Sequence, residues 1–169
     1  IEAAEIAAGL APGRSRRFAF ESLASFDAAA WTAMKDGPAP RATDHRFYGA
    51  DRDAGAVRMS GANAERAGVH DIATFDCRPF GDFAPPDGPP GLVMINPPYG
   101  GRIGNKKLLY GVYAGLGQVL LTRFAGWRVG MVTSEASLAK ASGLPFAPIG
   151  PSVAHGGTKI WLFRTGRLK

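Results

Sequence analysis

GLVMINPPYG, residues 91–100, is the stretch of sequence that decides the fold. The apolar run 92–95 is typical of an interior strand of a parallel sheet whose two faces are both covered. Pro97 and Pro98 cannot donate to a strand ladder, so the strand must end at Asn96. Open α/β sheets bind their ligands beyond the carboxyl ends of the strands. The sequence therefore predicts a binding site directly after this strand.

The four residues Asn96, Pro97, Pro98 and Tyr99 suit a planar base amine. The side-chain oxygen of Asn96 and the carbonyl of Pro97 can both accept hydrogen bonds from one exocyclic NH2 group. These bonds turn the nitrogen lone pair out of the base plane, while Tyr99 can stack on the ring. The pattern predicts methyl transfer to a base amine, with these four residues at the catalytic centre. A strand-to-loop turn with a packing tyrosine is the alternative.

Helical and strand patterns alternate along the chain. The predicted helices are residues 2–8, 26–34, 54–67, 107–124 and 136–141. The predicted strands are residues 45–50, 71–75, 91–96 and 128–133, with 145–149 and 158–164 as a closing antiparallel pair. Asp53 and Gly68 are expected to cap the third helix at its start and its end. This alternation predicts an α/β fold with a doubly wound sheet and right-handed crossovers.

Length and composition fit a single soluble domain. The chain has 169 residues, 46% of them hydrophobic, and no apolar run reaches the roughly 18 residues that a membrane span needs. Its single cysteine, Cys77, excludes an internal disulfide, so a reducing cytoplasm is the simpler expectation. The net charge of +6 suits a polyanionic partner, although ordinary solubilising charge explains it equally well. The most concentrated basic points, which could contact phosphates, are Arg14, Arg16, Arg17, Lys106 and Lys107.

Further segments carry a family resemblance. They are Ile1-Glu2-Ala3-Ala4, Ala11-Pro12-Gly13, Arg17-Phe18-Ala19-Phe20-Glu21, Phe26-Asp27, Trp31, Asp51, Asn63-Ala64, Ala67-Gly68-Val69, Asp76, Asn96-Pro97-Pro98-Tyr99-Gly100, Leu109-Tyr110 and Gly126-Trp127. With these segments, nearly the whole chain resembles the catalytic region of RNA guanine-N2 methyltransferases of the THUMP-associated type. Members of that family are often described as N6-adenine-specific DNA methylases.

The resemblance implies a class I, S-adenosylmethionine-dependent enzyme with a Rossmann-like sheet of strand order 3-2-1-4-5-7-6, the seventh strand being antiparallel. In that family a glycine-rich cofactor loop, Asp-Pro-x-Cys-Gly-Ser-Gly-Thr, follows strand 1 and lies directly before the segment that begins here at Ile1. Strand 1, this loop and an RNA-binding THUMP domain are therefore expected in a longer parent protein. Without strand 1, the strands on either side of its place would have unpaired edges. Residues 1–169 are expected to be one catalytic domain, incomplete at its amino terminus.

The ends of two further strands supply the implied cofactor contacts. Asp51 follows a predicted strand, where its carboxylate can accept both ribose hydroxyls of S-adenosylmethionine, and Arg52 could lie over the adenine. Asp76 can accept the adenine amino group while the backbone N–H of Cys77 donates to a ring nitrogen, as in similar methyltransferases. A loop-capping Asp76 and a plain surface Arg52 are the alternatives. Asn96 is expected to border the cofactor as well as the base.

The substrate side of the site lies beyond the Asn-Pro-Pro-Tyr run. Tyr99 and Arg102 could contact the target ring and its phosphate or base. The target must be single-stranded, looped or flipped out, because a base inside a helix cannot reach such a pocket. Ser134 and Glu135 follow a predicted strand and could border the same pocket.

Two departures from the family leave the target open. The family usually has an acidic residue where Gly101 stands, and relatives often carry Phe-Asn-Gly where this chain reads His155-Gly156-Gly157. The leading hypothesis is methylation of guanine N2 in RNA, with ribosomal RNA ahead of transfer RNA. The same geometry would serve adenine N6 in DNA. A non-catalytic nucleic-acid-binding module is a third hypothesis, suggested only by the absent glycine loop.

Other chemistries find no support in the sequence. No residues pair a nucleophile with a base and an orienting acid, and none has the spacing of metal ligands. The sequence does not indicate an oligomeric state.

Overall fold

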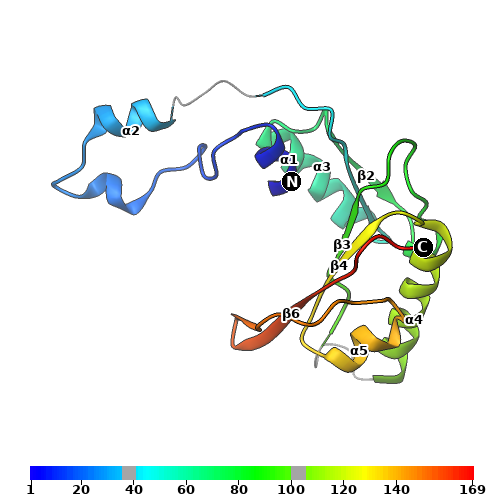
Figure 1. Cartoon of the computed structure of the whole chain (residues 1–169). Helices are drawn as coiled ribbons and strands as arrows, with labels where there is room; N and C mark the ends of the chain where they lie inside the picture. The colour runs from blue at the N-terminus through cyan, green and yellow to red at the C-terminus, as the bar shows by residue number, and fades with distance from the viewer. Residues whose placement is uncertain (36–40, 100–105) are drawn as a thin grey trace. The chain divides into compact units, whose positions relative to one another are not determined.

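The computed structural model describes residues 1–35, 41–99 and 106–169. Contacts divide the chain into two compact units, Ile1–Pro79 and Phe80–Lys169, each with its own sheet. Both units combine helices with parallel strands (Figure 1). Among the described residues, no helix has the length and apolar character that crossing a membrane requires.

Unit 1 is built on two parallel strands. Its elements in chain order are α1 (Glu2–Ala7), η1 (Ala19–Ser22), α2 (Ala28–Lys35), β1 (Phe47–Asp51), α3 (Ala54–Ala67) and β2 (Ala73–Cys77). β1 and β2 pair along their full lengths, and α3 packs against both. The small core of this unit is formed by Ala4, Ala64, Val69 and Ala73.

Local capping explains why α3 has the bounds that the sequence predicts. The Asp53 carboxylate accepts the backbone N–H groups of Gly55 at 2.6 Å and Ala56 at 3.1 Å, which have no partner inside the helix. Gly68 ends the helix with φ at 68°, in the left-handed region that favours glycine. Both predicted caps are therefore confirmed.

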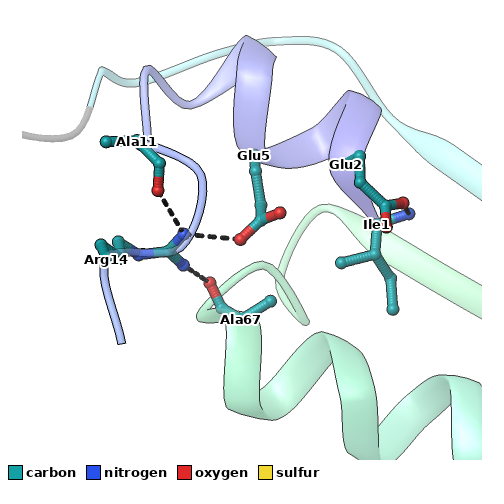
Figure 2. A network of polar contacts seen from close by, with 6 residues as sticks. All are labelled: Ile1, Glu2, Glu5, Ala11, Arg14 and Ala67. Atoms are coloured by element: carbon teal, nitrogen blue, oxygen red, sulfur yellow. Dashed lines mark hydrogen bonds and ion pairs between the residues drawn. The ribbon is translucent and has the colours of Figure 1, made fainter. Parts of the chain in front are cut away.

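Arg14 fastens the amino-terminal segment to α3. Its guanidinium donates to the Glu5 carboxylate at 2.5 Å, to the Ala11 carbonyl at 3.3 Å and to the Ala67 carbonyl at the end of α3 (Figure 2). The Arg14 and Glu5 side chains are both mostly buried. The sequence suggested Arg14 as a phosphate contact, but its charge is used within the fold of unit 1.

Unit 2 contains a four-stranded mixed sheet. Its elements in chain order are η2 (Phe80–Asp82), β3 (Leu92–Ile95), α4 (Lys106–Arg123), β4 (Arg128–Thr133), α5 (Ala136–Ala141), β5 (Val153–His155) and β6 (Thr158–Arg164). The strand order is β3-β4-β6-β5, with β3 parallel to β4 and β6 antiparallel to both of its neighbours. Together with β2-β1 in unit 1, these orders are the 3-2 and 4-5-7-6 parts of the expected Rossmann-like sheet.

The two faces of β3 differ in burial, whereas the sequence predicts a strand that is buried on both faces. Val93 is buried in the core, whereas Leu92 and Met94 are 52% and 55% exposed. The reason is that α4 and α5 pack against each other on one face of this sheet (Figure 1). Among the described residues, β3 also has a single neighbour, β4, so it is an edge strand of the unit 2 sheet.

The closing antiparallel pair forms with a different partner from the one predicted. β6 pairs with Val153–His155 and not with residues 145–149, of which Phe146 makes only an isolated bridge. Gly156 and Gly157 have φ values of 53° and 79°, the conformation of a tight two-residue hairpin turn, and this short connection sets the pairing. In unit 1, β2 likewise begins two residues later than predicted.

The close packing of α4 on α5 predicts a large effect at Gly117. A Cβ atom there would lie 1.6 Å from the Ser142 backbone oxygen at the end of α5, whereas one at Gly115 would meet nothing within 4 Å. We expect Gly117→Ala to lower the unfolding free energy by roughly 1–3 kcal/mol. Gly115→Ala, the matched control, should raise it by up to about 1 kcal/mol, because alanine favours helix. Urea unfolding measures both, and equal effects would contradict this packing.

A buried hydroxyl pair lies in the same core. Tyr113, on α4, donates to Thr133 Oγ1 at 3.1 Å, and both residues are fully buried. Burial raises the pKa of the Tyr113 phenol above its usual 10.0, and the nearby Glu135 carboxylate and Tyr99 raise it further, although the bond to Thr133 acts the other way.

Tyr113→Phe should therefore reduce stability in a pH-dependent way. At neutral pH the loss should be about 1 kcal/mol, the size of one buried hydrogen bond. Because the folded-state pKa is raised, the wild-type protein loses stability as the pH rises above about 10, and the variant lacks this loss. The gap between the two unfolding free energies should shrink there. Denaturation curves from pH 7 to pH 11 test this, and a constant gap would refute it.

Candidate active site

The carboxyl ends of β1 and β2 bring together the predicted cofactor residues of unit 1. The ladder pairs Ala50 with Asp76 and Asp51 with Cys77, and both strands end at that last pair. Arg52 follows Asp51 directly. Four residues predicted from separate parts of the sequence thus lie at one edge of the sheet, where α/β folds place ligands.

The hydrogen bonds at this edge leave acceptors available. Asp51 is exposed, and its Oδ1 accepts the backbone N–H of Asp53 at 2.9 Å, while the second carboxylate oxygen has no protein donor among the described residues. Asp76 pairs with Arg78 Nη2 at 3.1 Å. The thiol of Cys77 lies 3.7 Å from the Arg52 carbonyl. The edge therefore offers two carboxylates to hydroxyl or amino donors.

Arg78 was not found by the sequence analysis. It partly offsets the charge of Asp76, and its backbone N–H donates to the Asp51 carbonyl at 2.9 Å. A residue two positions beyond a strand-end carboxylate lies on the same side of an extended chain. That spacing was the available signal.

In unit 2, the Asn-Pro-Pro-Tyr turn leaves the sheet at the carboxyl end of β3. Pro97 is buried, and Tyr99 is partly buried against the main hydrophobic core. Asn96 and Pro98 are exposed. The turn is therefore held by its second and fourth residues, and the Asn96 amide remains accessible to a ligand.

β4 ends at the same edge as β3, and its last residue is polar. Thr133 is fully buried, and its Oγ1 accepts both the Tyr113 hydroxyl at 3.1 Å and the Glu135 backbone N–H at 3.2 Å. Glu135 is half-buried in the N-cap position of α5, and its side chain makes no capping bond. Thr133 Oγ1 thus links the Tyr113 hydroxyl on α4 to the backbone at the start of α5.

Tyr113 and Thr133 are the residues of this edge that the sequence analysis missed. Alternate residues of β4 face the core of unit 2, namely Val129, Met131 and Thr133. The first two are apolar, whereas Thr133 brings a hydroxyl to the same side of the strand. Buried hydroxyl groups require hydrogen-bond partners. This break in the apolar alternation was a signal that a second polar residue packs nearby.

Arg102 lies outside the described residues, so its contact with substrate stays a prediction. Within residues 1–35, 41–99 and 106–169, no group of three or more His, Cys, Asp or Glu side chains could hold a metal ion. Two surface hollows of unit 1 are lined by residues between 20 and 35, and none of these is a predicted site residue.

Comparison with known proteins identifies the family. A family model described as the RMKL-like methyltransferase domain matches residues 1–145. The ribosomal RNA large subunit methyltransferase K/L of Allochromatium vinosum is 40% identical over 151 residues, which cover 85% of this chain and 20% of that protein. The corresponding protein of Marinobacter nauticus is 34% identical over 153 residues. The chain thus spans about a fifth of the length of these relatives.

Solved structures agree with this assignment. A possible methylase from Clostridium difficile 630 matches with a TM-score of 0.88 and 25% identity, over 99% of this chain and 45% of that chain. SMU.472, described as a methyltransferase and solved in complex with SAH, matches with a TM-score of 0.87 and the same identity and coverage. The fold is therefore that of Rossmann-like methyltransferases. Because the family model covers most of its length, the chain belongs to the family of RMKL-like methyltransferase domains.

Proposed function

We propose that the protein is an S-adenosylmethionine-dependent methyltransferase that methylates guanine N2 in ribosomal RNA. The observation that carries this proposal is the Asn-Pro-Pro-Tyr turn at the carboxyl end of β3. In this turn Asn96 is exposed, while Pro97 is buried and Tyr99 packs against the core. Family membership supports methyl transfer, and the relatives described as ribosomal RNA methyltransferases support the substrate class. The SAH complex of SMU.472 supports the cofactor.

The hydrogen-bonding groups at the ends of β1 and β2 fit an adenosine group. The Asp51 carboxylate accepts the ribose hydroxyls, and Asp76 accepts the adenine amino group, since ionised carboxylates are pure acceptors. The Cys77 backbone N–H donates to a ring nitrogen, and Arg52 covers the adenine face. The cofactor supplies a methyl group that is already activated on a sulfonium. The chain's own residues hold and orient the adenosine.

On the substrate side, the turn after β3 aligns the base. The Asn96 side-chain oxygen and the Pro97 carbonyl accept the two amino hydrogens, so the nitrogen lone pair points out of the base plane. Tyr99 stacks on the ring from its anchored position, and Arg102 contacts the target phosphate or base. Alignment of this kind supplies roughly 7 to 11 kcal/mol in well-oriented systems. No strong general base is needed, because the amine proton leaves after attack.

Nucleic acid as substrate agrees with the charge of the chain. The net charge is +6, and Arg16 and Arg17 have exposed side chains, although Arg17 is within 3.5 Å of Glu21. A polyanion is attracted to such a surface before any specific contact forms. The base itself must be unpaired or flipped out to reach Asn96.

Transfer of labelled methyl tests the proposal directly. The complete gene product is incubated with radiolabelled S-adenosylmethionine and either total RNA or DNA, and the labelled nucleosides are identified. We expect N2-methylguanosine in ribosomal RNA. Labelled N6-methyladenine in DNA would replace the proposed target by the base that the same amine geometry also fits. No label in either nucleic acid would overturn the proposed activity.

Asn96→Ala should abolish methyl transfer, because it removes one of the two acceptors that orient the amine. Cofactor affinity should stay within about threefold, since the adenosine contacts lie on β1 and β2. Asn63→Ala is the matched control, because Asn63 is exposed on α3 and pairs only with Arg66 among the described residues. Turnover by the Asn96 variant equal to that of the control would rule out this role.

Asp51→Ala should weaken cofactor binding by about 1 kcal/mol or more, the scale of a lost hydrogen bond to a charged group. Isothermal titration calorimetry with S-adenosylmethionine measures the change. Asp44→Ala serves as the control, since Asp44 is exposed and lies before β1. If both variants bind the cofactor as the wild type does, Asp51 does not belong to the site.

A further inference from the structure

Glu135 occupies a position whose charge the fold of unit 2 does not use. Its carboxylate forms no ion pair with any residue that the structure describes, and it does not cap α5. Yet the residue is half-buried, and its backbone N–H is fixed on Thr133 Oγ1 at 3.2 Å. A partly buried acceptor without a protein donor is available to a ligand that carries a donor.

Strand pairing brings the segment that carries Glu135 to the same edge of the sheet as the Asn-Pro-Pro-Tyr segment. The ladder runs from the pair Leu92 and Arg128 to the pair Ile95 and Met131, and both strands leave the sheet at the same edge. Adjacent strands lie about 4.8 Å apart. The turn begins one residue beyond this ladder, and Glu135 lies four residues beyond it. Tyr113 links the two sides, because its hydroxyl bonds Thr133 and its ring belongs to the core cluster against which Tyr99 packs.

The chemistry of a base held at this edge decides what Glu135 can accept. In guanine, the ring N1–H lies next to the exocyclic amino group. A guanine whose amino group is bonded to Asn96 can therefore present its N1–H to a neighbouring acceptor. In adenine, the ring nitrogen next to the amino group carries a lone pair and no hydrogen. An ionised carboxylate accepts from the first and repels the second.

We propose that Glu135 is a specificity-determining residue that accepts the ring N1–H of the target guanine and so excludes adenine. The assignment rests on the proposed methylation of guanine N2 and adds to it the group that selects the base. Thr133 and Tyr113 act as positioning residues, because they fix the start of α5 and hence the place of the carboxylate.

The test compares two substrates that share the 2-amino group and differ at ring N1 and at C6, where 2-aminopurine lacks the oxygen of guanine. The complete gene product and its Glu135→Gln variant are assayed on an RNA fragment that carries the mapped target, with either guanine or 2-aminopurine at that position. 2-Aminopurine keeps the 2-amino group and has an unprotonated N1. Glutamine keeps the size of the side chain and the backbone bond to Thr133. Glu65→Gln, on the exposed side of α3, is the matched control.

The wild-type protein and the control should prefer guanine by roughly tenfold or more in kcat/KM, the range for a hydrogen bond to a charged group. In Glu135→Gln, kcat/KM for guanine should fall roughly tenfold to hundredfold. The value for 2-aminopurine should stay within about threefold or rise, since the glutamine amide can donate to N1. The ratio of the kcat/KM values for the two substrates is the readout that a general structural defect would not change.

Two results would overturn the assignment while leaving the proposed function intact. One is an equal fall on both substrates, which would mean a structural role for Glu135. The other is a Glu135→Gln variant whose kcat/KM is unchanged on both substrates, so that its preference for guanine equals that of the wild type. A wild-type protein that methylates no guanine in any RNA would overturn the proposed function and the role of Glu135 with it.

Discussion

The parallel ladder between β3 and β4 is the constraint on which the candidate site of unit 2 depends. Parallel strands end at the same edge of a sheet, so the segments that follow them are brought together by backbone pairing alone. The segments that carry Asn96 and Glu135 therefore reach one edge without any attraction between the two side chains. The ladder between β1 and β2 does the same for Asp51 and Asp76 in unit 1.

Apolar packing and one satisfied hydroxyl pair then support this edge. Pro97 is buried and Tyr99 packs on the core, so the turn after β3 cannot rotate as a free loop would. The bond from Tyr113 to Thr133 lies fully inside, where leaving either hydroxyl unpaired would be costly. Such support matters for function, because small displacements of the reacting groups slow a reaction that relies on their alignment. Tyr113 and Thr133 thus support the candidate site without a proposed ligand contact of their own.

What could be predicted from the sequence follows from the range of each signal. The bounds of α3, β4 and α5 were predicted correctly, because caps and alternation lie within each segment. The exposed face of β3 and the partner of β6 were not, since both depend on which distant element arrives. The positions of Asp51, Asp76 and Asn96 at the ends of strands were likewise predictable from local pattern, whereas their roles stay predictions. Tyr113 and Thr133 are 20 residues apart in sequence, and only tertiary packing joins them.

The proposed division of tasks also explains why the acceptors at the amine are neutral. A carboxylate in the place of Asn96 would bind the amino hydrogens more tightly in the ground state, because hydrogen bonds to charged groups are stronger. Such binding does not lower the barrier unless it strengthens in the transition state. A carboxylate on ring N1–H instead acts one atom away from the reacting nitrogen. Glu135 can therefore select the base while Asn96 and the Pro97 carbonyl align it, so selectivity and alignment can change independently.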